Sequence, residues 1–216
     1  MTLQKQIEDM QAQMLLQVSA ETVDVLMAGN KKIFLSHIEE GALKAGDRMP
    51  EFHLSNHLGQ IISSSELLGS GTLIINFYRG SWCPYCNLEL HALHEKEEEI
   101  KKLGVQLIAI SPELPDGTLT SVEKHNLSFQ VLSDIDNIVA EKFGLVFSLP
   151  EELKEIYLGF GINLEKANGN NKWQLPIPAT YIVTSDGTIS YAFVNPDYTK
   201  RLEPEELLEQ LKKAKE

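Results

Sequence analysis

The sequence predicts an α/β fold built around parallel strands. From Leu73 onward, short apolar runs alternate with helical patterns, which is the order that builds a parallel sheet. The runs "TLIINFY" and "VQLIAIS" are typical of buried strands. The stretch 84–102 between them repeats its apolar residues on one helical face, from Leu90 to Leu103, and turns "EKEEE" outward. These three segments are expected to form one strand-helix-strand unit.

Two helical stretches precede this unit. Apolar residues in 1–18 recur every three or four positions, which predicts an amphipathic helix, and a second helical stretch runs from Glu21 to about Leu43. Pro50 in "GDRMPEF" then favours a new, extended start. We therefore expect a helical N-terminal arm over residues 1–45 and a single catalytic domain over residues 46–216.

Further elements follow the second strand. "FQVLSD" is expected to be a strand, Asn137 to Phe143 a short helix, and "TYIVTSDGTISYAFV" a hairpin closed by an Asp-Gly turn at 186–187. A C-terminal helix carries three leucines between positions 207 and 211. Residues 145–177 combine a helical pattern with the loop-like "EKANGNNKW", and we interpret them as an insertion near the site.

Charge and composition narrow the class of function. The 216 residues are 43% hydrophobic and 23% charged, as in a soluble globular protein. A net charge of -12 and only three arginines make nucleic acid a poor partner, because phosphate binding needs clustered Lys or Arg. No apolar run reaches about 18 residues, and the first residues lack the apolar core of a secretory signal. We expect a cytoplasmic protein with no nucleic-acid or membrane partner.

Both cysteines lie in "FYRGSWCPYCNLEL", three positions apart. Cys83 follows a strand and a short loop, and Pro84 takes the first helical position, which suits proline because that N–H has no helical partner. Cys83 is therefore expected to cap a helix, where the helix dipole and free N–H groups favour the thiolate and lower its pKa. In a cytosolic protein, such a pair is more often catalytic or metal-binding than a structural disulfide.

The pair is open to three interpretations. A cysteine is often a small core residue, but a Cys-x-x-Cys motif that opens the helix of a strand-helix-strand unit favours redox chemistry. A zinc site would need His91 and His94, and on one continuous helix His94 lies roughly 16 Å along the axis from Cys83. That span exceeds a tetrahedral site. We expect no metal and no cofactor, and both histidines to be solvated or salt-bridged.

Several stretches together resemble the peroxiredoxin-like branch of the alkyl hydroperoxide reductase and thiol-specific antioxidant (AhpC/TSA) family. The resemblance covers residues 46 to about 210, in the same order throughout. It implies a thioredoxin-like fold, with a central mixed β-sheet flanked by helices and an N-terminal β-hairpin. The stretches are "GDRMPEFHLSNHLGQIISSSELL", "FYRGSWCPYCNLELHAL", "LIAISPE", "FQVLSDIDNIVAEKFGL" and "LPIPATYIVTSDGTISYAFVNPDYTKR".

This resemblance implies a thiol-dependent peroxidase, an antioxidant oxidoreductase with Cys83 as the peroxidatic cysteine. Its thiolate attacks the O–O bond of hydrogen peroxide or an organic hydroperoxide and becomes a sulfenic acid. We expect Cys86 to resolve the sulfenic acid as an intramolecular disulfide, which thioredoxin or a similar thiol reduces. Arg79, the one arginine near Cys83 in sequence, is expected to stabilise the thiolate or polarise a peroxide oxygen. An ordinary ion pair is the alternative for Arg79.

The site departs from the family pattern at two positions. Gly80 stands where peroxiredoxins carry the Thr of a Pro-x-x-x-Thr-x-x-Cys loop, with Ser81 one place later. Pro178 aligns with the family's later arginine and matches the cis-proline of thioredoxins, so we expect a cis bond that faces Cys83. Together with "WCPYC", which is similar to thioredoxins and glutaredoxins, these departures make a protein disulfide oxidoreductase the second candidate function. A redox-inactive binding domain is the third.

Four residues are the candidate substrate-binding set, namely Tyr78, Ser81, Trp82 and Pro178. Trp82 is expected to shield the cysteines from bulk water. The apolar stripe of the arm suggests a contact in a homodimer, and a stripe that covers the arm's own domain is the alternative.

Overall fold

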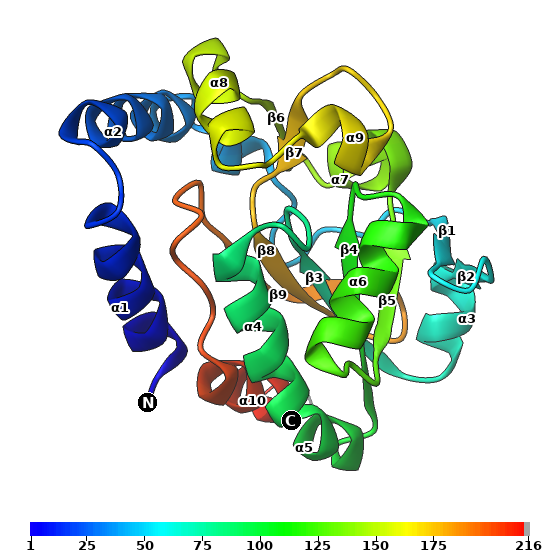
Figure 1. Cartoon of the computed structure of the whole chain (residues 1–216). Helices are drawn as coiled ribbons and strands as arrows, with labels where there is room; N and C mark the ends of the chain where they lie inside the picture. The colour runs from blue at the N-terminus through cyan, green and yellow to red at the C-terminus, as the bar shows by residue number, and fades with distance from the viewer. Residues whose placement is uncertain (214–216) are drawn as a thin grey trace.

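The computed structural model describes residues 1–213, apart from the side chains of Lys124 and His125 (Figure 1). Within this part of the chain, the main sheet has seven strands in the order β2-β1-β5-β4-β3-β8-β9. β3, β4 and β5 are parallel, and the other four strands run antiparallel to their neighbours. The strands are β1 (His53–Asn56), β2 (Ile61–Ser63), β3 (Thr72–Phe77), β4 (Val105–Ser111), β5 (Gln130–Ser133), β8 (Ala179–Val183) and β9 (Ile189–Val194). β6 (Val146–Ser148) and β7 (Gln174–Pro176) form a second, antiparallel pair.

Helices cover both faces of the main sheet. They are α1 (Leu3–Leu15), α2 (Ala20–Leu35), α3 (Ser64–Gly69), α4 (Pro84–Glu95), α5 (Glu97–Lys102), α6 (Pro115–His125), α7 (Ile138–Lys142), α8 (Glu151–Gly159), α9 (Leu164–Asn168) and α10 (Pro204–Lys213), with 3-10 turns η1 (Ile38–Gly41) and η2 (Ile135–Asn137). Among the described helices, none is long and apolar enough to cross a membrane.

The central strands explain the apolar runs of the sequence. β3 and β4 are buried along nearly their whole length, because helices pack on both sides of them. Side chains alternate between the two faces, so Leu73 and Ile75 pack in the same apolar cluster as Val139 of α7. Ile74 packs in the opposite cluster, with Leu90 of α4. The predicted α/β fold with parallel central strands is therefore confirmed.

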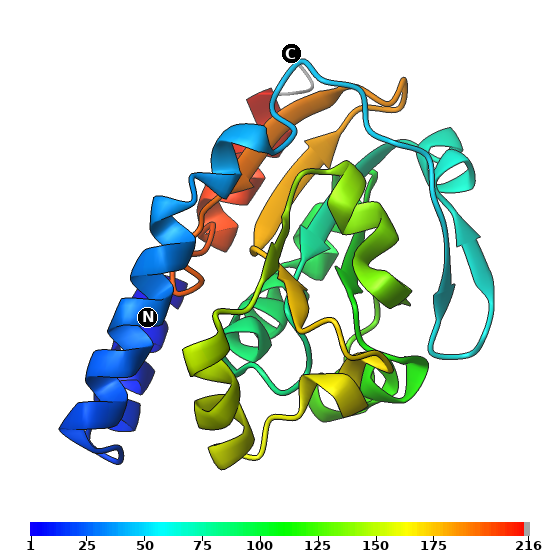
Figure 2. The ribbon, with the colours of Figure 1, turned by 90° about the horizontal axis from the view of Figure 1, so that it is seen from above.

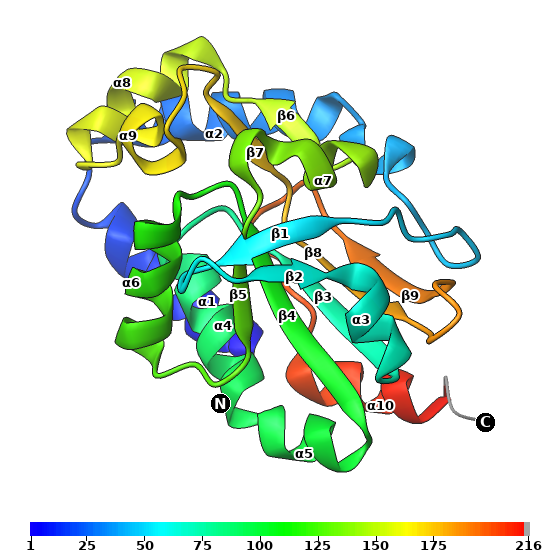
Figure 3. The ribbon, with the colours of Figure 1, turned by 90° about the vertical axis from the view of Figure 1, so that its right-hand side faces the viewer.

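The predicted β-hairpin before the central strands is also present. β1 and β2 pair antiparallel, and β1 continues the sheet next to β5. Figure 3 shows this hairpin and α3 together at that edge of the sheet. At the other edge, β8 and β9 form the second predicted hairpin, with Gly187 in its turn at φ +86°.

Two predicted helices differ from the observed ones. The stretch 84–102 is divided at Lys96, whose N–H bonds back to the carbonyl of Leu93 in a tight turn, so α4 and α5 are separate helices. The second helix of the arm ends at Leu35 rather than near Leu43, because His37 takes a left-handed conformation at φ +51°. Neither turn carries a glycine or proline that would have marked it in the sequence.

The helical arm packs against its own chain. The carboxylate of Glu203, just before α10, accepts hydrogen bonds from the N–H groups of Leu3 and Gln4, at 3.0 and 2.8 Å, which caps α1. Ile7 is fully buried in the cluster that contains α4. Figure 2 shows α1 and α2 along one side of the molecule, next to the C-terminal segment. The predicted division at residue 45 stays a prediction, and residues 214–216 lie outside the described residues.

The insertion over residues 145–177 contributes β6, α8, α9 and β7. These elements enclose a small apolar cluster of their own that includes Leu153 and Trp173. α8 also packs on α2 of the arm, where Gly29 lies directly against Leu153. The insertion and the arm therefore pack against each other, and Gly29 allows the close approach of α2 and α8.

Replacing Gly29 by alanine is expected to destabilise the protein although alanine is the better helix former. A Cβ at this position would lie 2.6 Å from the Leu153 side chain, which is fully buried. Such overpacking costs typically 1–3 kcal/mol, against a gain of about 1 kcal/mol in helix propensity. Urea unfolding of Gly29→Ala would show the loss, with Gly159→Ala as the control, since Gly159 has open space around it. A stability for Gly29→Ala at or above that of the control would contradict the prediction.

Candidate active site

The two cysteines open α4 directly after β3. Cys83 is the N-cap of α4 in extended backbone geometry, and Pro84 takes the first helical position, as the sequence predicted. Cys86 lies one turn further on the same helix. Both side chains are fully buried free thiols. The α4 N-terminus therefore presents a thiol pair inside the molecule rather than on its surface.

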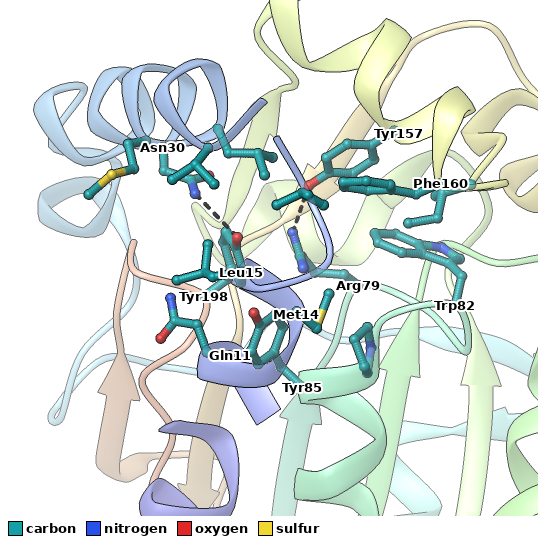
Figure 4. Close-up of a pocket in the computed structure, with 16 residues that line it drawn as sticks. Gln11, Met14, Leu15, Asn30, Arg79, Trp82, Tyr85, Tyr157, Phe160 and Tyr198 are labelled. Atoms are coloured by element: carbon teal, nitrogen blue, oxygen red, sulfur yellow. Dashed lines mark hydrogen bonds between the residues drawn. The ribbon is translucent and has the colours of Figure 1, made fainter. Parts of the chain in front are cut away.

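Arg79 lies against Cys83. Its Nη2 donates to the Cys83 Sγ at 3.1 Å, and its Nη1 donates to the Tyr157 hydroxyl at 3.0 Å. The guanidinium carbon lies 4.0 Å from the ring centroid of Tyr198 and 5.2 Å from that of Trp82 (Figure 4). Arginine stacks well on aromatic faces because it is planar and weakly hydrated. The rings and the thiol together hold a buried cation in one position.

Arg201 is a second buried arginine, and the sequence analysis did not assign it to the site. Its Nη2 donates to the Cys86 Sγ at 3.3 Å, and its Nε donates to the carboxylate of Glu89 at 2.7 Å. A further hydrogen bond joins its Nη1 to the Tyr198 carbonyl. The one signal available in the sequence was that the chain has only three arginines. Arg79 therefore contacts the sulfur of Cys83, and Arg201 contacts the sulfur of Cys86.

The two thiols differ in acidity. Burial opposes ionisation of Cys83, but a hydrogen bond from Cys86 and the charges of Arg79 and Arg201 outweigh it and hold the pKa of Cys83 well below its usual value. Burial, the hydrogen bond to Cys83 and the negative charge of Cys83 raise the pKa of Cys86 well above its usual value. Of the two thiols, Cys83 is therefore the one that ionises more readily.

The loop before Cys83 explains why position 80 is a glycine. Gly80 has φ +148°, a conformation that side chains with a Cβ rarely adopt, and a Cβ there would lie 2.4 Å from the Trp82 Nε1. Ser81 follows, with its N–H and hydroxyl donating to the carboxylate of Glu113 at 2.6 and 2.9 Å. The Ser81 hydroxyl therefore already donates its hydrogen to Glu113.

Tyr78 and Pro178 lie at the end of β3 that precedes the cysteine loop. Tyr78 is fully buried, with its hydroxyl 3.5 Å from Ser121 Oγ. Because Phe77 pairs with Ala179 across β3 and β8, Pro178 lies beside the end of β3. The predicted cis bond before Pro178 is wrong, since the described residues contain only trans peptide bonds. Only Ile177 and Pro178 connect β7 to β8, and the Ile177 N–H donates to the Leu145 carbonyl at 2.8 Å.

A cavity of about 160 Å³ lies against Arg79 (Figure 4). Its wall combines side chains of α1, α2, the insertion and the start of α4, and Trp82 is part of it. The lining residues are Gln11, Met14, Leu15, Val18, Val23, Leu26, Met27, Asn30, Arg79, Trp82, Pro84, Tyr85, Tyr157, Phe160, Ile162 and Tyr198. Of the four candidate substrate-binding residues, Trp82 alone appears in this wall.

The two histidines of α4 face carboxylates. The His91 Nε2 lies 3.8 Å from Glu95, and the His94 Nδ1 lies 3.2 Å from Glu97. Among the side chains that the structure describes, no group of three or more His, Cys, Asp or Glu is arranged to hold a metal ion. The cysteines and histidines of α4 are thus separate features of the helix.

The fold and site define a class, that of thioredoxin-fold proteins with a thiol pair at a helix N-terminus. Residues 45–192 match the model of the AhpC/TSA family, and the chain belongs to this family. Peroxiredoxin Bcp of Escherichia coli (strain K12) is 35% identical over 103 residues, which are 48% of this chain and 65% of that protein. The aligned part is thus just under two thirds of the relative's length.

Two further comparisons bear on the site. Thiol-disulfide oxidoreductase ResA of Halalkalibacterium halodurans is 31% identical over 103 residues, or 47% of this chain and 57% of that protein. The crystal structure of peroxidoxin BcpB from Mycobacterium tuberculosis is similar with a TM-score of 0.63 at 19% identity, over 79% of this chain and 97% of that chain. The predicted thioredoxin-like fold is confirmed by this structural similarity. The residues of the arm before position 45 lie outside the family match.

Removing the charge of Arg79 is expected to raise the pKa of Cys83. An opposite charge within about 4–6 Å typically shifts a pKa by one to three units, so Arg79→Gln should raise it by about that amount. Thiolate absorbance in the ultraviolet, followed against pH, measures the change. Arg48→Gln is the matched control because Arg48 is largely exposed and lies beside Asp186. Equal titration of Cys83 in both variants would rule out Arg79 as the stabilising charge.

Glu113 is expected to make stability depend on pH. Burial raises its pKa to about 7 from 4.5, although the hydrogen bonds from Ser81 oppose this. The folded form therefore holds the proton more tightly than the unfolded chain. Its stabilising contribution is complete below about pH 4.5 and is lost as the pH rises through about 7.

Glu113→Gln should remove this loss of folding stability at higher pH. We expect urea unfolding between pH 5 and pH 8 to show a smaller decrease in the free energy of unfolding for the variant than for the unmodified chain. Glu123→Gln, at an exposed position of α6, serves as the control. The same decrease in all three proteins would show that Glu113 is ionised throughout this range.

Proposed function

We propose that the protein is a thiol-dependent peroxidase that reduces hydroperoxides at Cys83. The observation that supports this most is the contact between Arg79 and the Cys83 sulfur, in a fully buried site whose charges favour the thiolate. Membership of the AhpC/TSA family and the similarity to peroxiredoxin Bcp agree with the proposal.

The first step oxidises the sulfur. The Cys83 thiolate attacks the terminal oxygen of a hydroperoxide, an S–O bond forms and the O–O bond breaks. Sulfur becomes a sulfenic acid, and the peroxide is reduced to an alcohol or, for hydrogen peroxide, to water. The departing oxygen leaves as an anion that takes up a proton from solvent. Arg79 is suited to stabilise both the attacking thiolate and this developing charge.

The second step uses Cys86. Its sulfur attacks the sulfenic sulfur of Cys83, a disulfide forms, and the sulfenic oxygen leaves as water. Arg201 lies 3.3 Å from the Cys86 Sγ and is placed to favour its ionisation at that stage. We propose that thioredoxin or a similar thiol then reduces the disulfide. A cytoplasmic location and a homodimer stay predictions from the sequence.

A thiol-disulfide oxidoreductase is the second candidate function. The "WCPYC" sequence and the similarity to ResA favour it. Burial counts more against this candidate than against the peroxidase, because a protein disulfide would have to reach the buried Cys83 in the defining step, whereas in the peroxidase only the thiol that recycles the enzyme has to reach the pair. A small hydroperoxide has to displace much less of the protein. Stopped-flow oxidation by hydrogen peroxide, compared with reduction of insulin disulfides, separates the two activities.

The two cysteines are expected to give different products with one equivalent of peroxide. Unmodified protein should become about 2 Da lighter as the disulfide forms, whereas Cys86→Ser should gain about 16 Da as sulfenic acid and over-oxidise readily. Cys83→Ser should stay unchanged. Mass spectrometry of the intact protein distinguishes these products.

Two results would overturn parts of the assignment. Accumulation of sulfenic acid in the unmodified protein, without a disulfide, would make Cys86 structural and resolution dependent on an external thiol. Oxidation of Cys83→Ser at the rate of the unmodified chain would show that Cys83 is not the nucleophile.

A further inference from the structure

We infer that Glu89 is a positioning residue for the second thiol step, because it neutralises Arg201 and so keeps Cys86 protonated until Cys83 has been oxidised. This inference rests on the proposed function and assigns the regulation of the same site. The order of the two thiol steps is then set by buried charges on α4 and in the loop before α10.

Arg201 holds Cys86 and Glu89 side by side. Its Nη2 donates to the Cys86 Sγ at 3.3 Å, and its Nε donates to a carboxylate oxygen of Glu89 at 2.7 Å. These two nitrogens lie on one edge of the planar guanidinium, where a single carboxylate often accepts both hydrogen bonds. Cys86 and Glu89 are three positions apart on α4, which places them on the same face of the helix. The thiol and the carboxylate therefore compete for one positive charge.

This competition takes place away from water. Cys86 has no exposed surface, and Glu89 and Arg201 are 2% and 5% exposed. Charges in such a place act on each other more strongly than in water, and each of them needs a partner. Burial lowers the pKa of Arg201, but the negative charges of Glu89, Cys86 and Cys83, in that order of size, raise it above its usual value. Glu89 is therefore the main counter-charge of Arg201.

Glu89 is ionised in mildly alkaline solution. Burial raises the pKa of its carboxyl to about 7, although the charge of Arg201 and the buried Asn76 side chain of β3 oppose this. Above this pH, the Glu89 carboxylate neutralises Arg201. Burial, the hydrogen bond to Cys83 and the negative charge of Cys83 then hold the pKa of Cys86 above its usual value.

Oxidation of Cys83 changes this balance of charge. In the reduced site, the Cys83 thiolate and the Glu89 carboxylate offset the charges of Arg79 and Arg201. A sulfenic acid is neutral at Cys83, so its formation leaves the buried cluster with an excess of positive charge. Cys86 then loses its proton at a lower cost in free energy. Its thiolate attacks the sulfenic sulfur, the S–S bond forms and the S–O bond breaks. The hydroxide that leaves takes up one proton, as many as Cys86 lost, and becomes water.

The other titratable groups around the two thiols contribute no competing charge to Arg201. Glu113, which follows β4, accepts two hydrogen bonds from Ser81. Burial raises the pKa of Tyr78, Tyr85 and Tyr198, so these three hydroxyls are neutral near pH 8. α1 packs on α4 through apolar side chains. Glu89 is therefore the carboxyl whose charge Arg201 meets directly.

The test is a thiolate titration of the reduced full chain by ultraviolet absorbance. Protein that carries both Cys83→Ser and Cys86→Ser supplies the baseline, and the two cysteines should give two thiol steps. Removing a neighbouring charge shifts a pKa by about one unit or more, so Glu89→Gln should raise the Cys86 thiolate fraction at pH 8 by roughly tenfold or more. Adding Arg201→Gln removes the unpaired positive charge and should reverse this change.

Glu97→Gln is the matched control. Glu97 is also buried at 3% exposure and pairs with a cation, Lys101 at 2.8 Å, but it lies on α5. The variant should leave both thiol steps unchanged. If the second thiol step does not move in Glu89→Gln, or if Arg201→Gln does not reverse the change, the inference is overturned and the peroxidase proposal stays intact.

The rate of disulfide formation gives a second readout. After one equivalent of hydrogen peroxide, the disulfide phase of Glu89→Gln should reach its maximum at a lower pH than that of the unmodified chain. A disulfide phase that is slower at every pH would overturn the inference, because Glu89 would then be the proton acceptor for Cys86. If peroxide does not oxidise Cys83, the peroxidase proposal fails, whereas the thiolate titration still decides whether Glu89 controls Cys86.

A measurement on the unmodified chain covers the case in which Glu89→Gln does not fold. NMR of isotope-labelled glutamate carboxyls reports the ionisation of Glu89 directly, and Glu89→Asp, which keeps the charge, identifies its signal. The carboxyl should be ionised at pH 8 in the reduced protein. A protonated Glu89 under these conditions would overturn the inference, because Arg201 would then lack its counter-charge.

Discussion

The buried charge of Arg79 is the constraint on which the site depends. Taking a guanidinium out of water costs several kcal/mol, and two aromatic contacts at roughly 1 kcal/mol each do not offset that cost. The Cys83 sulfur accepts a hydrogen bond from Arg79 and supplies the missing negative charge when it is ionised, and the Tyr157 hydroxyl accepts one further hydrogen bond. The requirement acts in both directions, because a buried thiolate is equally unstable without a cation. Arginine and cysteine therefore make each other's ionised state possible in a place that excludes water.

The arm and the insertion follow from the same constraint. Both lie over the site, and they bring Tyr157 and the apolar wall to a cysteine that would otherwise lie near the surface at a helix N-terminus. Asn30 of α2 ties the arm to Tyr198, whose ring stacks on Arg79. The arm and the insertion thus contribute to the electrostatics of the Cys83 thiol as well as to its burial. The central fold positions the cysteines, and these two segments determine the surroundings of the cysteines.

Sequence patterns predicted what depends on local spacing. Apolar runs in the sequence predicted the buried strands. The strand, the glycine-containing loop and Pro84 together predicted that Cys83 lies at the start of a helix. Arg79 was found because it lies four positions from Cys83. Arg201 was missed because it lies 115 positions from Cys86 and only the fold brings the two together. The expected cis bond at Pro178 came from resemblance to thioredoxins, and no local pattern supported it; the bond in the structure is trans.

The capping of α1 by Glu203 has a consequence for biosynthesis. These partners are about 200 positions apart, so α1 finds this cap only after Glu203 has been synthesised. Until then its apolar stripe has no surface to cover, and contacts of such high sequence separation form late in folding. The nascent protein therefore has its thiol pair before it has the cover over it. During that interval the thiol pair lacks the part of its cover that α1 provides in the folded protein.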